Sequence, residues 1–333
     1  MKILLTGAFG NIGTSVVQEL VKRPHQLTCF DLKTNYSTKT AARFGERINV
    51  IWGDVRSRED VARAVQGQDV VIHTAALIPH QSITGLESEA QPDLARAVNV
   101  EGTRNVIEAI KAQAQPPKLV FTSSLHIYGQ TQHLPPPRTV NDELHPIEHY
   151  AKHKQQCEQM IKESGITWAI LRLSAALPVR LILDDSMFNV PLDNRIEYVH
   201  TGDVGLALSN AAESDSVWGK TLLIGGGRKC QMVYRDLVKQ VFGAVGIGAL
   251  PESAFTTVPY SVDWLDTDES QRLLNYQRRT LDDYVRDTLG MLGYLQPVLR
   301  LTRPLVRYIM LRQSSYYWQR KPSSGEVLRH VFD

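Results

Sequence analysis

A glycine-rich turn directly after an apolar run is the feature that most constrains this chain, with the sequence TGAFGNIG over residues 6–13. The preceding run Lys2–Thr6 has the pattern of a buried strand, and the apolar spacing from Asn11 to Lys22 predicts a helix that ends before Pro24. Glycine allows a tight turn, and a helix N-terminus offers free N–H groups with partial positive charge. The arrangement predicts a pyrophosphate site, although glycines alone would also suit an ordinary strand–helix turn.

A carboxylate at the end of the next predicted strand, Gln26–Asp31, indicates which dinucleotide binds there. Asp31 lies eighteen residues after Gly13, where a carboxylate accepts hydrogen bonds from both adenosine ribose hydroxyls. Its charge would repel a 2′-phosphate, and Lys33 nearby would soften that repulsion. We therefore expect NAD as the cofactor, with NADP less favoured.

The first half of the chain alternates short β-branched runs with longer amphipathic runs, a pattern typical of a parallel sheet with crossover helices. Its further strands and helices are expected at Asn49–Gly53, Val70–Thr74, Lys118–Ser123 and Trp168–Leu173, and at Asp93–Ala114 and Ile147–Ser164. We expect an α/β fold with a Rossmann-type doubly wound parallel sheet over residues 1–172. The proline-rich segment Gly129–Pro146 should form a surface loop at the mouth of a site.

The pattern is less regular after Leu173. Candidate elements there are Tyr198–Asn210 (strand to helix), Lys220–Ile224, Tyr234–Val245 and Leu281–Leu292. We expect a small substrate-binding lobe over residues 173–290, interleaved with the last strands of the sheet. A basic amphipathic C-terminal extension should follow over residues 291–333.

Composition and charge exclude several classes of protein. A net charge of +2 over 333 residues does not suit a protein that binds nucleic acid. The three cysteines are odd in number and widely spaced, which argues against a disulfide framework or a zinc site and is compatible with a reducing cytosol. Neither a signal peptide nor a stretch long and uncharged enough to span a bilayer is visible, so we expect a cytoplasmic protein.

Three histidines recur at a spacing that could hold a metal ion on one helix face: His145, His149 and His153. Two of them neighbour Tyr150 and Lys154 in the sequence and must therefore point about 100° away from those side chains. No carboxylate completes a ligand set, so we expect surface histidines and no metal site.

Two further groups of residues follow predicted strands, where ligands bind in open parallel sheets. Asp54, with Val55 after it, would suit a hydrogen bond to the adenine amino group or a cap on the following helix. Thr74, Ala75 and Ala76 follow the fourth strand and leave room for a flat ring system, although the alanines would also suit a plain core.

Tyr150 and Lys154 lie four residues apart and share one face of a predicted helix. A free tyrosine has a pKa of about 10, and an adjacent ammonium together with an oxidised nicotinamide would favour its phenolate. Tyr150 is therefore a candidate acid or base near neutral pH. Ser123 and Ser124 end the fifth predicted strand and offer hydroxyl groups to hold a reacting oxygen.

Taken together, these residues resemble the extended short-chain dehydrogenase/reductases, the superfamily of NAD-dependent sugar epimerases and dehydratases. The resemblance runs from Met1 to about Arg172, with its motifs in order. Each motif is weak alone and the set is specific: Thr6–Gly13, Asp31, Asp54-Val55, His73–Ala76, NVEGT from Asn99, SSLHIYG from Ser123, and Tyr150–Lys154.

The resemblance implies a role for each matching residue. Tyr150 would be the general acid/base, and Lys154 would hold the nicotinamide ribose and lower the pKa of Tyr150. Ser124 would orient the substrate oxygen, Asn99 would support the active-site backbone, and Ser123 would be more structural. The residues expected to contact the cofactor are Gly7, Phe9, Gly10, Asn11, Ile12, Gly13, Asp31, Leu32, Lys33, Asp54, Val55, Thr74, Ala75, Ala76, Asn99, Ser123, Tyr150 and Lys154.

The implied reaction is hydride transfer between C4 of the nicotinamide and a carbinol or carbonyl carbon of a small-molecule substrate. Family dehydratases carry Thr-Asp-Glu at the serine position, where this chain has Ser-Leu-His, so elimination is not expected. An epimerase that keeps the hydride on bound NAD is one alternative. A non-catalytic, NAD(P)-sensing regulator is another, although the presence of both Tyr150 and Lys154 counts against it. Family members often pair through the helices corresponding to Asp93–Ala114 and Ile147–Ser164, so we expect a homodimer.

Departures from the family bear on the substrate. Nucleotide-sugar members place an arginine seven residues before the aspartate that matches Asp203, whereas this chain has Ile196 there, with Arg195 one residue away. The substrate-side segment is largely apolar, and a diphosphate needs cationic or N–H donors. We therefore expect a small or moderately apolar substrate, as in the hydroxysteroid-type branch, with Arg228 as a cation that a loop could still deliver. Candidate contacts by position are His80, His126, Ala175 and Arg180.

The C-terminal segment has an unusual charge pattern, because residues 288–325 contain no acidic residue. On a helical wheel Arg300, Arg303 and Arg307 share one face, roughly opposite to Leu301, Leu305, Tyr308 and Ile309. The pattern is typical of a helix on an anionic membrane surface. It also suits an arginine-rich helix packed on the body or on a partner subunit, with Pro304 at a kink. We expect the packed arrangement and keep peripheral membrane contact as the alternative.

Overall fold

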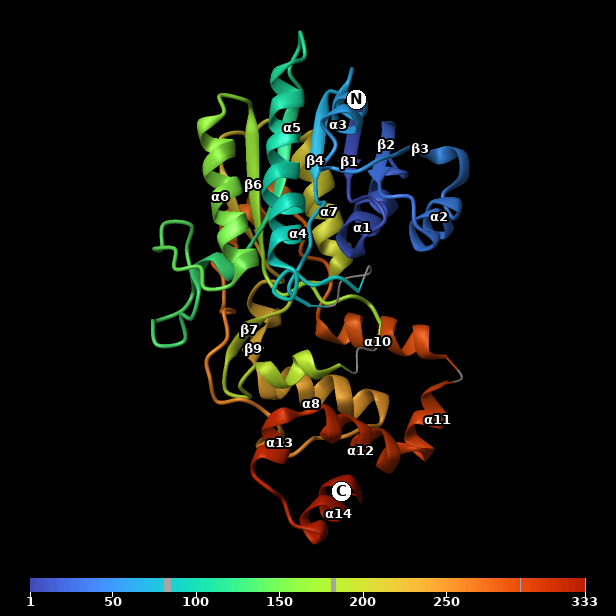
Figure 1. The fold of residues 1–333 in the computed structure, drawn as a ribbon, viewed down its shortest axis with the longest axis vertical. Helices are drawn as coiled ribbons and strands as arrows, with labels where there is room; N and C mark the ends of the chain where they lie inside the picture. The colour runs from blue at the N-terminus through green and yellow to red at the C-terminus, as the bar shows by residue number, and fades with distance from the viewer. Residues whose placement is uncertain (81–84, 181–183, 294, 333) are drawn as a thin grey trace.

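A seven-stranded parallel sheet forms the centre of the N-terminal half in the computed structural model, which describes residues 1–80, 85–180, 184–293 and 295–332 (Figure 1). The strand order is β3-β2-β1-β4-β5-β6-β8. The strands are β1 Lys2–Thr6, β2 Gln26–Asp31, β3 Asn49–Trp52, β4 Val70–His73, β5 Lys118–Ser124, β6 Trp168–Leu173 and β8 Thr221–Ile224. The expected doubly wound α/β sheet is confirmed, and each strand predicted in the first half is present within one residue of its predicted end.

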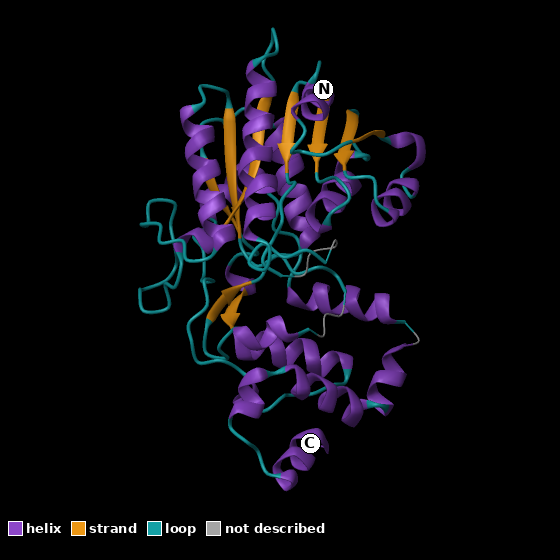
Figure 2. Ribbon diagram, viewed as in Figure 1, coloured by secondary structure: helices purple, strands orange, loops and turns teal. Residues whose placement is uncertain are grey.

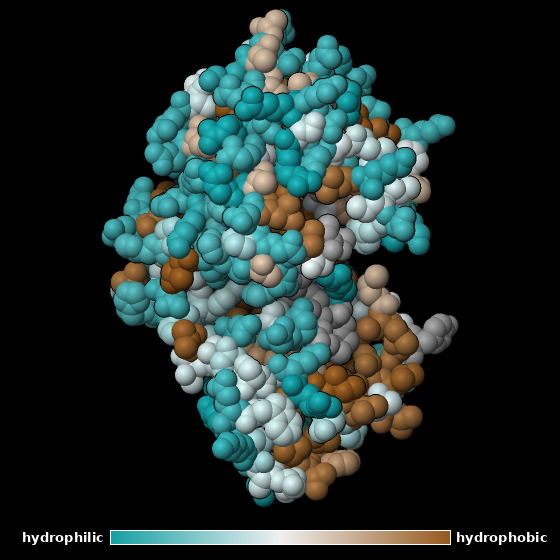
Figure 3. Space-filling model, in the orientation of Figure 1, coloured by the Kyte–Doolittle hydropathy of each residue, from teal (hydrophilic) through white to brown (hydrophobic). Residues whose placement is uncertain are grey.

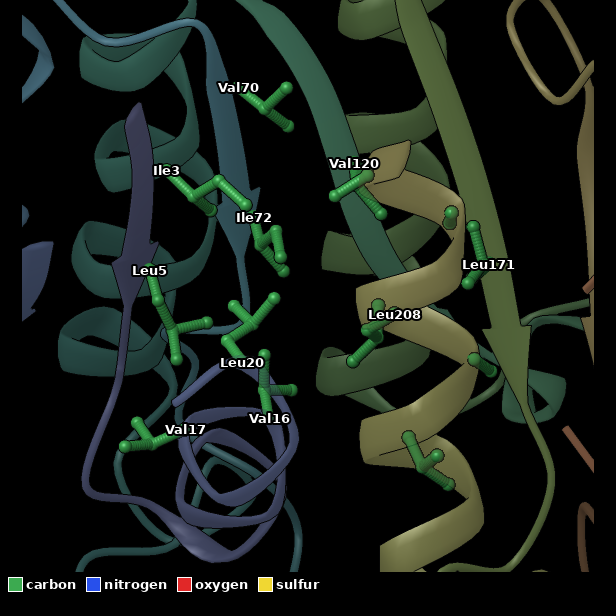
Figure 4. Packing of buried hydrophobic residues seen from close by; sticks show 14 of the residues in the cluster. Ile3, Leu5, Val16, Val17, Leu20, Val70, Ile72, Val120, Leu171 and Leu208 are labelled. Carbon is green, nitrogen blue, oxygen red and sulfur yellow. The ribbon is translucent and has the colours of Figure 1, made fainter. Parts of the chain in front are cut away.

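Helices cover both faces of this sheet (Figure 2). On one face, α1 (Asn11–Leu20) and α7 (Thr201–Glu213) pack against each other and against the strands. Figure 4 shows how the apolar side chains of these helices meet those of the strands, including Val16, Leu20, Leu208, Ile72 and Val120. The opposite face is covered by α3 Arg58–Val65, α5 Gly102–Lys111 and α6 His149–Glu163. The central strands are buried on both faces of the sheet, and their sequences are therefore almost continuously apolar.

A second, smaller layer lies beyond the carboxyl ends of the strands (Figure 1). It holds the antiparallel pair of β7 (Arg195–Glu197) and β9 (Gln231–Val233), and its own apolar core includes Tyr198, Phe242 and Met310. Its helices are α8 Tyr234–Val245, α10 Leu281–Leu292, α11 Leu295–Leu301, α12 Arg303–Gln313, α13 Ser315–Gln319 and α14 Ser324–Phe332. The chain returns to the sheet between these elements, because α7, β8 and α9 (Asp268–Leu274) belong to the first layer.

Several helices differ from the sequence expectation, and three differences have a clear local cause. The helix expected over Asp93–Ala114 is divided into α4 (Pro92–Arg96), a π-helical turn (Ala97–Glu101) and α5. No helix is predicted at α2 (Asn35–Ala42), because its residues NYSTKTAA lack an apolar stripe, and a capping box formed by Thr34 starts it instead. Pro304 does not kink a helix, because α11 ends at Leu301. It lies in the first turn of α12, where backbone N–H groups have no partner within the helix, so the missing N–H of proline costs no hydrogen bond.

Candidate active site

A cavity of about 580 Å³ lies between the sheet and the smaller layer, and both contribute to its lining. The strand order reverses between β1 and β4, and in open α/β sheets ligands bind in the crevice at such a point. The space-filling view is hollowed at the boundary between the two parts (Figure 3). The fold therefore provides the site that the sequence pattern requires.

The glycine turn after β1 places backbone, rather than side chains, against this cavity. Gly7 has a φ of +65°, and a Cβ there would lie 2.7 Å from the Cα atom of Ala75. A Cβ at Gly13 would lie 2.0 Å from the carbonyl oxygen of Gly7. Gly10 is the N-cap of α1 and has no side chain to cap it, so the first N–H groups of the helix face the crevice. This geometry fits a pyrophosphate.

Asp31 is held in place by the same turn. Its Oδ2 accepts a hydrogen bond from the Phe9 N–H at 2.8 Å, and its Oδ1 accepts one from the Leu32 N–H at 2.7 Å. Burial raises the pKa of Asp31, and these two N–H groups act in the opposite direction. Each carboxylate oxygen keeps a lone pair that a ribose hydroxyl can use. Lys33, by contrast, is exposed and is not among the described residues that line the cavity.

Asp54 and Val55 line the cavity after β3. The Asp54 carboxylate accepts hydrogen bonds from the Arg56 backbone N–H at 2.9 Å and from Arg56 Nε at 2.8 Å. The following helix, α3, is capped by Ser57, whose hydroxyl accepts a hydrogen bond from the Asp60 N–H at 3.2 Å. The interpretation of Asp54 as a helix cap is therefore wrong, and its carboxylate lies beside the cavity.

The segment after β4 forms one wall of the cavity through Thr74, Ala75 and Ala76. Asn99 lies behind this wall and is buried. Its Oδ1 accepts a hydrogen bond from the Leu77 N–H at 2.7 Å, and its Nδ2 donates to the Leu77 carbonyl at 2.9 Å. Asn99 thus fixes the backbone of the wall from outside the cavity.

The candidate catalytic side chains come together where β5 ends and α6 begins. Ser123, Ser124 and Tyr150 line the cavity, and Lys154 lies one helical turn further along α6, buried beneath Tyr150. The ammonium of Lys154 donates to the carbonyl of Thr122 at 2.7 Å and lies 5.6 Å from the centre of the Tyr150 ring. The predicted grouping of serine, tyrosine and lysine is therefore present in space.

Burial dominates the titration of this pair. It raises the pKa of Tyr150, and a hydrogen bond with Ser124 acts in the opposite direction. It also lowers the pKa of Lys154 to about 8. The expectation that Lys154 lowers the pKa of Tyr150 is not met among the protein's own groups, because burial raises this pKa and the opposing effect comes from Ser124. Tyr150 therefore holds its proton at neutral pH unless a further positive charge lies close to it.

A histidine stands beside this pair. His126 lines the cavity, and its Nδ1 lies 2.6 Å from Oε2 of Glu148. The centre of its ring is 6.1 Å from that of Tyr150 and 5.4 Å from that of Tyr260, edge to face in both cases. Glu148 therefore fixes the orientation of the imidazole next to the tyrosine.

The helix that carries Tyr150 is held by a residue that the sequence analysis missed. Glu89, from the segment before α4, accepts hydrogen bonds from the His149 and Tyr150 N–H groups, both at 3.0 Å. Burial alone would raise the pKa of Glu89, but these bonds together lower it. The residues next to the start of α6 do not reveal this cap. The N-cap position holds Glu148, whose side chain does not cap the helix, and Glu89 lies sixty residues before His149 in the sequence.

The half of the cavity formed by the smaller layer is largely apolar. Ile196 lines it, and Arg180 is the one cation among the described residues of this half. Arg195 is bound to Asp263 at 2.7 Å, and neither it nor the exposed Arg228 is among the described lining residues. His80 and Ala175 do line the cavity. Lining residues that the sequence analysis did not identify include Met187, Val190, Leu237, Val238, Val241, Phe242, Tyr260, Val262 and Tyr284.

The described part of the chain contains neither a metal-binding cluster nor a membrane-spanning helix. No three or more His, Cys, Asp or Glu side chains there gather closely enough to hold a metal ion. No described helix has the length and apolar character needed to cross a membrane.

Comparison with known proteins gives this site a family. The family model described as the NAD dependent epimerase/dehydratase family matches residues 3–177, which include the glycine turn, Asp31, Ser124, Tyr150 and Lys154. The chain belongs to this family. Within it, the curated relatives include the 3 beta-hydroxysteroid dehydrogenase type 7 of Homo sapiens, 34% identical over 50% of this chain and 43% of that protein. The N-acetyl-alpha-D-glucosaminyl-diphospho-ditrans,octacis-undecaprenol 4-epimerase of Escherichia coli O157:H7 is 31% identical over 48% of this chain and 43% of that protein.

Solved structures of similar fold extend over most of the chain. A UDP-glucose 4-epimerase from Stenotrophomonas maltophila, solved with NAD, has a TM-score of 0.73 and 23% identity, covering 90% of this chain and 99% of that one. A short-chain dehydrogenase/reductase superfamily protein from Agrobacterium tumefaciens, also solved with NAD, has a TM-score of 0.71 and 18% identity, covering 91% and 100%. At these identities the structures support the fold alone. The chain spans less than half the length of the two curated relatives named above.

Proposed function

We propose that this protein is an NAD-dependent oxidoreductase that interconverts a secondary alcohol and a ketone on a largely apolar substrate. The observation that carries the proposal is that one cavity joins a polar half, which fits the cofactor, to a largely apolar half formed by the smaller layer. Ser124 and Tyr150 lie at the boundary of the cofactor half, and the wall opposite is built from aliphatic and aromatic side chains with Ile196 among them.

The chain's own residues would hold the cofactor through the glycine turn, Asp31 and the wall at Thr74 to Ala76. The backbone N–H groups at the start of α1 would bind the pyrophosphate, and Asp31 the adenosine ribose. When bound, NAD supplies a hydride acceptor at C4 of its nicotinamide ring.

Proton transfer would fall to Tyr150. Ser124 would hold the substrate oxygen by a hydrogen bond, and Tyr150 would remove the hydroxyl proton during oxidation or return it during reduction. Because burial keeps the phenol protonated, Tyr150 needs more than one positive charge nearby to release that proton. The ammonium of Lys154, 5.6 Å from the centre of its ring, and the oxidised nicotinamide of bound NAD would act together. Lys154 is mostly charged below about pH 8, so it can serve at neutral pH.

The apolar wall favours a rigid, mostly hydrocarbon alcohol of the hydroxysteroid class over a nucleotide sugar. A diphosphate would need several donors, and the described residues of the substrate half offer one cation, Arg180. The resemblance to 3 beta-hydroxysteroid dehydrogenases supports this choice. The epimerase relatives support the second candidate, a sugar 4-epimerase, which would use the same tyrosine without releasing reduced cofactor.

A substrate panel tests the proposal. Purified protein with NAD is incubated with detergent-solubilised 3β-hydroxysteroids, other apolar secondary alcohols and UDP-sugars, and free NADH is followed by absorbance. We expect NADH only with the apolar alcohols, and its formation to fall by about 10²- to 10⁴-fold in Tyr150→Phe. Tyr308→Phe, which removes the same oxygen from an exposed tyrosine, should leave the rate unchanged. Interconversion of a UDP-sugar without net NADH would overturn the proposal in favour of the epimerase.

A further inference from the structure

The C-terminal helices expose an apolar strip that a chain folded in water would normally bury. The strip consists of Met291 on α10, three residues of α11 and two of α12, namely Leu295, Val298, Leu301, Leu305 and Ile309. Leu301 is 85% exposed, and each of the others is about half exposed or more. Figure 3 shows apolar residues gathered over this side of the smaller layer, where Figure 1 places α10, α11 and α12. Exposed apolar surface of this kind is typical of a docking site.

The exposure is fixed by the arginines on the opposite side of α12. Arg307 is 2% exposed and donates hydrogen bonds to the carbonyls of Ile247, Ala249 and His330. Arg303 donates to the same Ile247 carbonyl through Nε at 3.1 Å. The Ile247 and Ala249 carbonyls follow the C-terminal end of α8, where cations are favoured, and the His330 carbonyl belongs to α14. Turning Leu305 and Ile309 inward would break these bonds, so the fold holds α12 with Arg303 and Arg307 on its inner side and Leu305 and Ile309 on its outer side.

The surface around the strip carries positive charge. Arg300, Arg312, Arg320, Lys321 and Arg329 are exposed, and residues 288–325 contain no acidic residue. Trp318, exposed beside this group, suits the headgroup level of a bilayer. A second copy of the chain docked on the same strip through a two-fold axis would bring these cations against each other. An anionic lipid surface would instead bind the apolar residues and the cations together.

We propose that this strip docks the protein on an anionic phospholipid bilayer, with Leu301 and Leu305 inserted among the lipids and Arg312 and Lys321 at the headgroups. The docking is peripheral, because no described helix can cross a membrane. The strip is also continuous with the cavity. Tyr284 and Thr288 line the cavity from α10, and Met291 follows on the same helix. If the proposed function holds, a membrane-dissolved alcohol would have a short path from the bilayer to Tyr150.

Co-sedimentation with vesicles tests the docking independently of any turnover. The full chain is spun with vesicles of pure phosphatidylcholine, or of phosphatidylcholine with phosphatidylglycerol, at low and high salt. We expect sedimentation with the anionic vesicles, weakened by salt, and at least about tenfold weaker binding for Leu301→Glu/Leu305→Glu and for Arg312→Glu/Lys321→Glu. Leu134→Glu is the control, because it adds a charge at an exposed leucine of the loop between β5 and α6, on the other side of the molecule (Figure 1).

Fold is checked in each variant by thermal unfolding and by NADH binding. Wild-type protein that stays in the supernatant with anionic vesicles at low salt would overturn the proposal, as would equal sedimentation of the wild type and the leucine variant. A wild-type dimer by light scattering that becomes a monomer in the leucine variant, without vesicle binding, would assign the strip to a second copy of the chain.

Discussion

At the scale of single residues, the site combines two ionisable groups whose burial shifts their pKa values in opposite senses. Tyr150 is held in its protonated form, and Lys154 is held close to losing its charge near neutral pH. The charged form of each group is costly away from water, so each side chain needs a hydrogen-bond partner in the protein. The Thr122 carbonyl accepts a hydrogen bond from Lys154, and the Ser124 hydroxyl forms one with Tyr150.

Lys154 should make the protein less stable at neutral pH than at alkaline pH. Its pKa is 10.5 when free and about 8 in the folded protein, so between these values the unfolded chain binds more protons and the free energy of unfolding rises with pH. We expect the stability of wild type relative to Lys154→Met to improve by up to about 3 kcal/mol across this window. Denaturant unfolding of both proteins from neutral to alkaline pH measures it. A pH-independent difference would mean that Lys154 titrates normally.

Asp31 should set the preference for NAD. Asp31→Asn keeps an acceptor for the Phe9 N–H and removes the charge that repels a 2′-phosphate. We expect NADH to bind about tenfold more weakly and NADPH more tightly, which is a change of roughly 1.4 kcal/mol or more in the difference between them. Titrations of both cofactors by fluorescence give the two dissociation constants. An unchanged ratio would show that another group selects the cofactor.

At the scale of elements, the β1–α1 turn depends on glycine at position 13. In Gly13→Ala the new Cβ would lie 2.0 Å from the Gly7 carbonyl oxygen, so backbone must move. We expect a loss of about 2 kcal/mol or more of stability together with the loss of NADH binding. Gly243→Ala is the matched control, because nothing lies within 4 Å of a Cβ there and α8 should gain about 0.5–1 kcal/mol. Thermal unfolding and NADH titration of both variants check this.

The start of α6 depends on Glu89 in a pH-dependent way. The carboxylate has a lowered pKa in the folded protein, so its stabilisation is present above the ordinary value of 4.5 and is lost as pH falls through the lower folded value. Glu89→Ala should cost about 0.5–2 kcal/mol at neutral pH and nothing in acid, and it should slow turnover by loosening Tyr150. Chemical denaturation at neutral and acid pH measures the difference. An equal effect from Glu108→Ala, an exposed glutamate of α5, would contradict it.

Elements with a strong local signal could be predicted from the sequence. The bounds of α8 and α10 match their predictions to the residue, because the apolar spacing is regular and a capping box at Thr280 starts α10. The apolar wall of the cavity could not be predicted. Leu237 and Val241 on α8 have the spacing of any buried helix face, and nothing local distinguishes a face that lines a cavity from one that packs on a core. The tail pattern likewise identified two opposite faces and could not say which one turns inward.

At the scale of the whole molecule, the two layers form different parts of the site. The first layer has the architecture of a dinucleotide site. The second supplies the apolar lining of the cavity that Tyr150 also lines, and exposes an apolar strip on its outer surface. The pairing of α5 and α6 between two copies stays a prediction. These two helices pack against each other on one face of the sheet (Figure 1), and that face is opposite to the one covered by α1 and α7.

The most direct test of the account is a single turnover with an apolar secondary alcohol, such as a 3β-hydroxysteroid, that carries deuterium on its carbinol carbon. Purified protein and NAD are mixed with it, and the products are separated and examined by mass spectrometry. We predict a ketone without the deuterium and released NADH that carries it, with neither formed by Tyr150→Phe. The account is contradicted if a UDP-sugar labelled at C4 is inverted with its deuterium retained, no labelled NADH is released, and the apolar alcohol is unchanged.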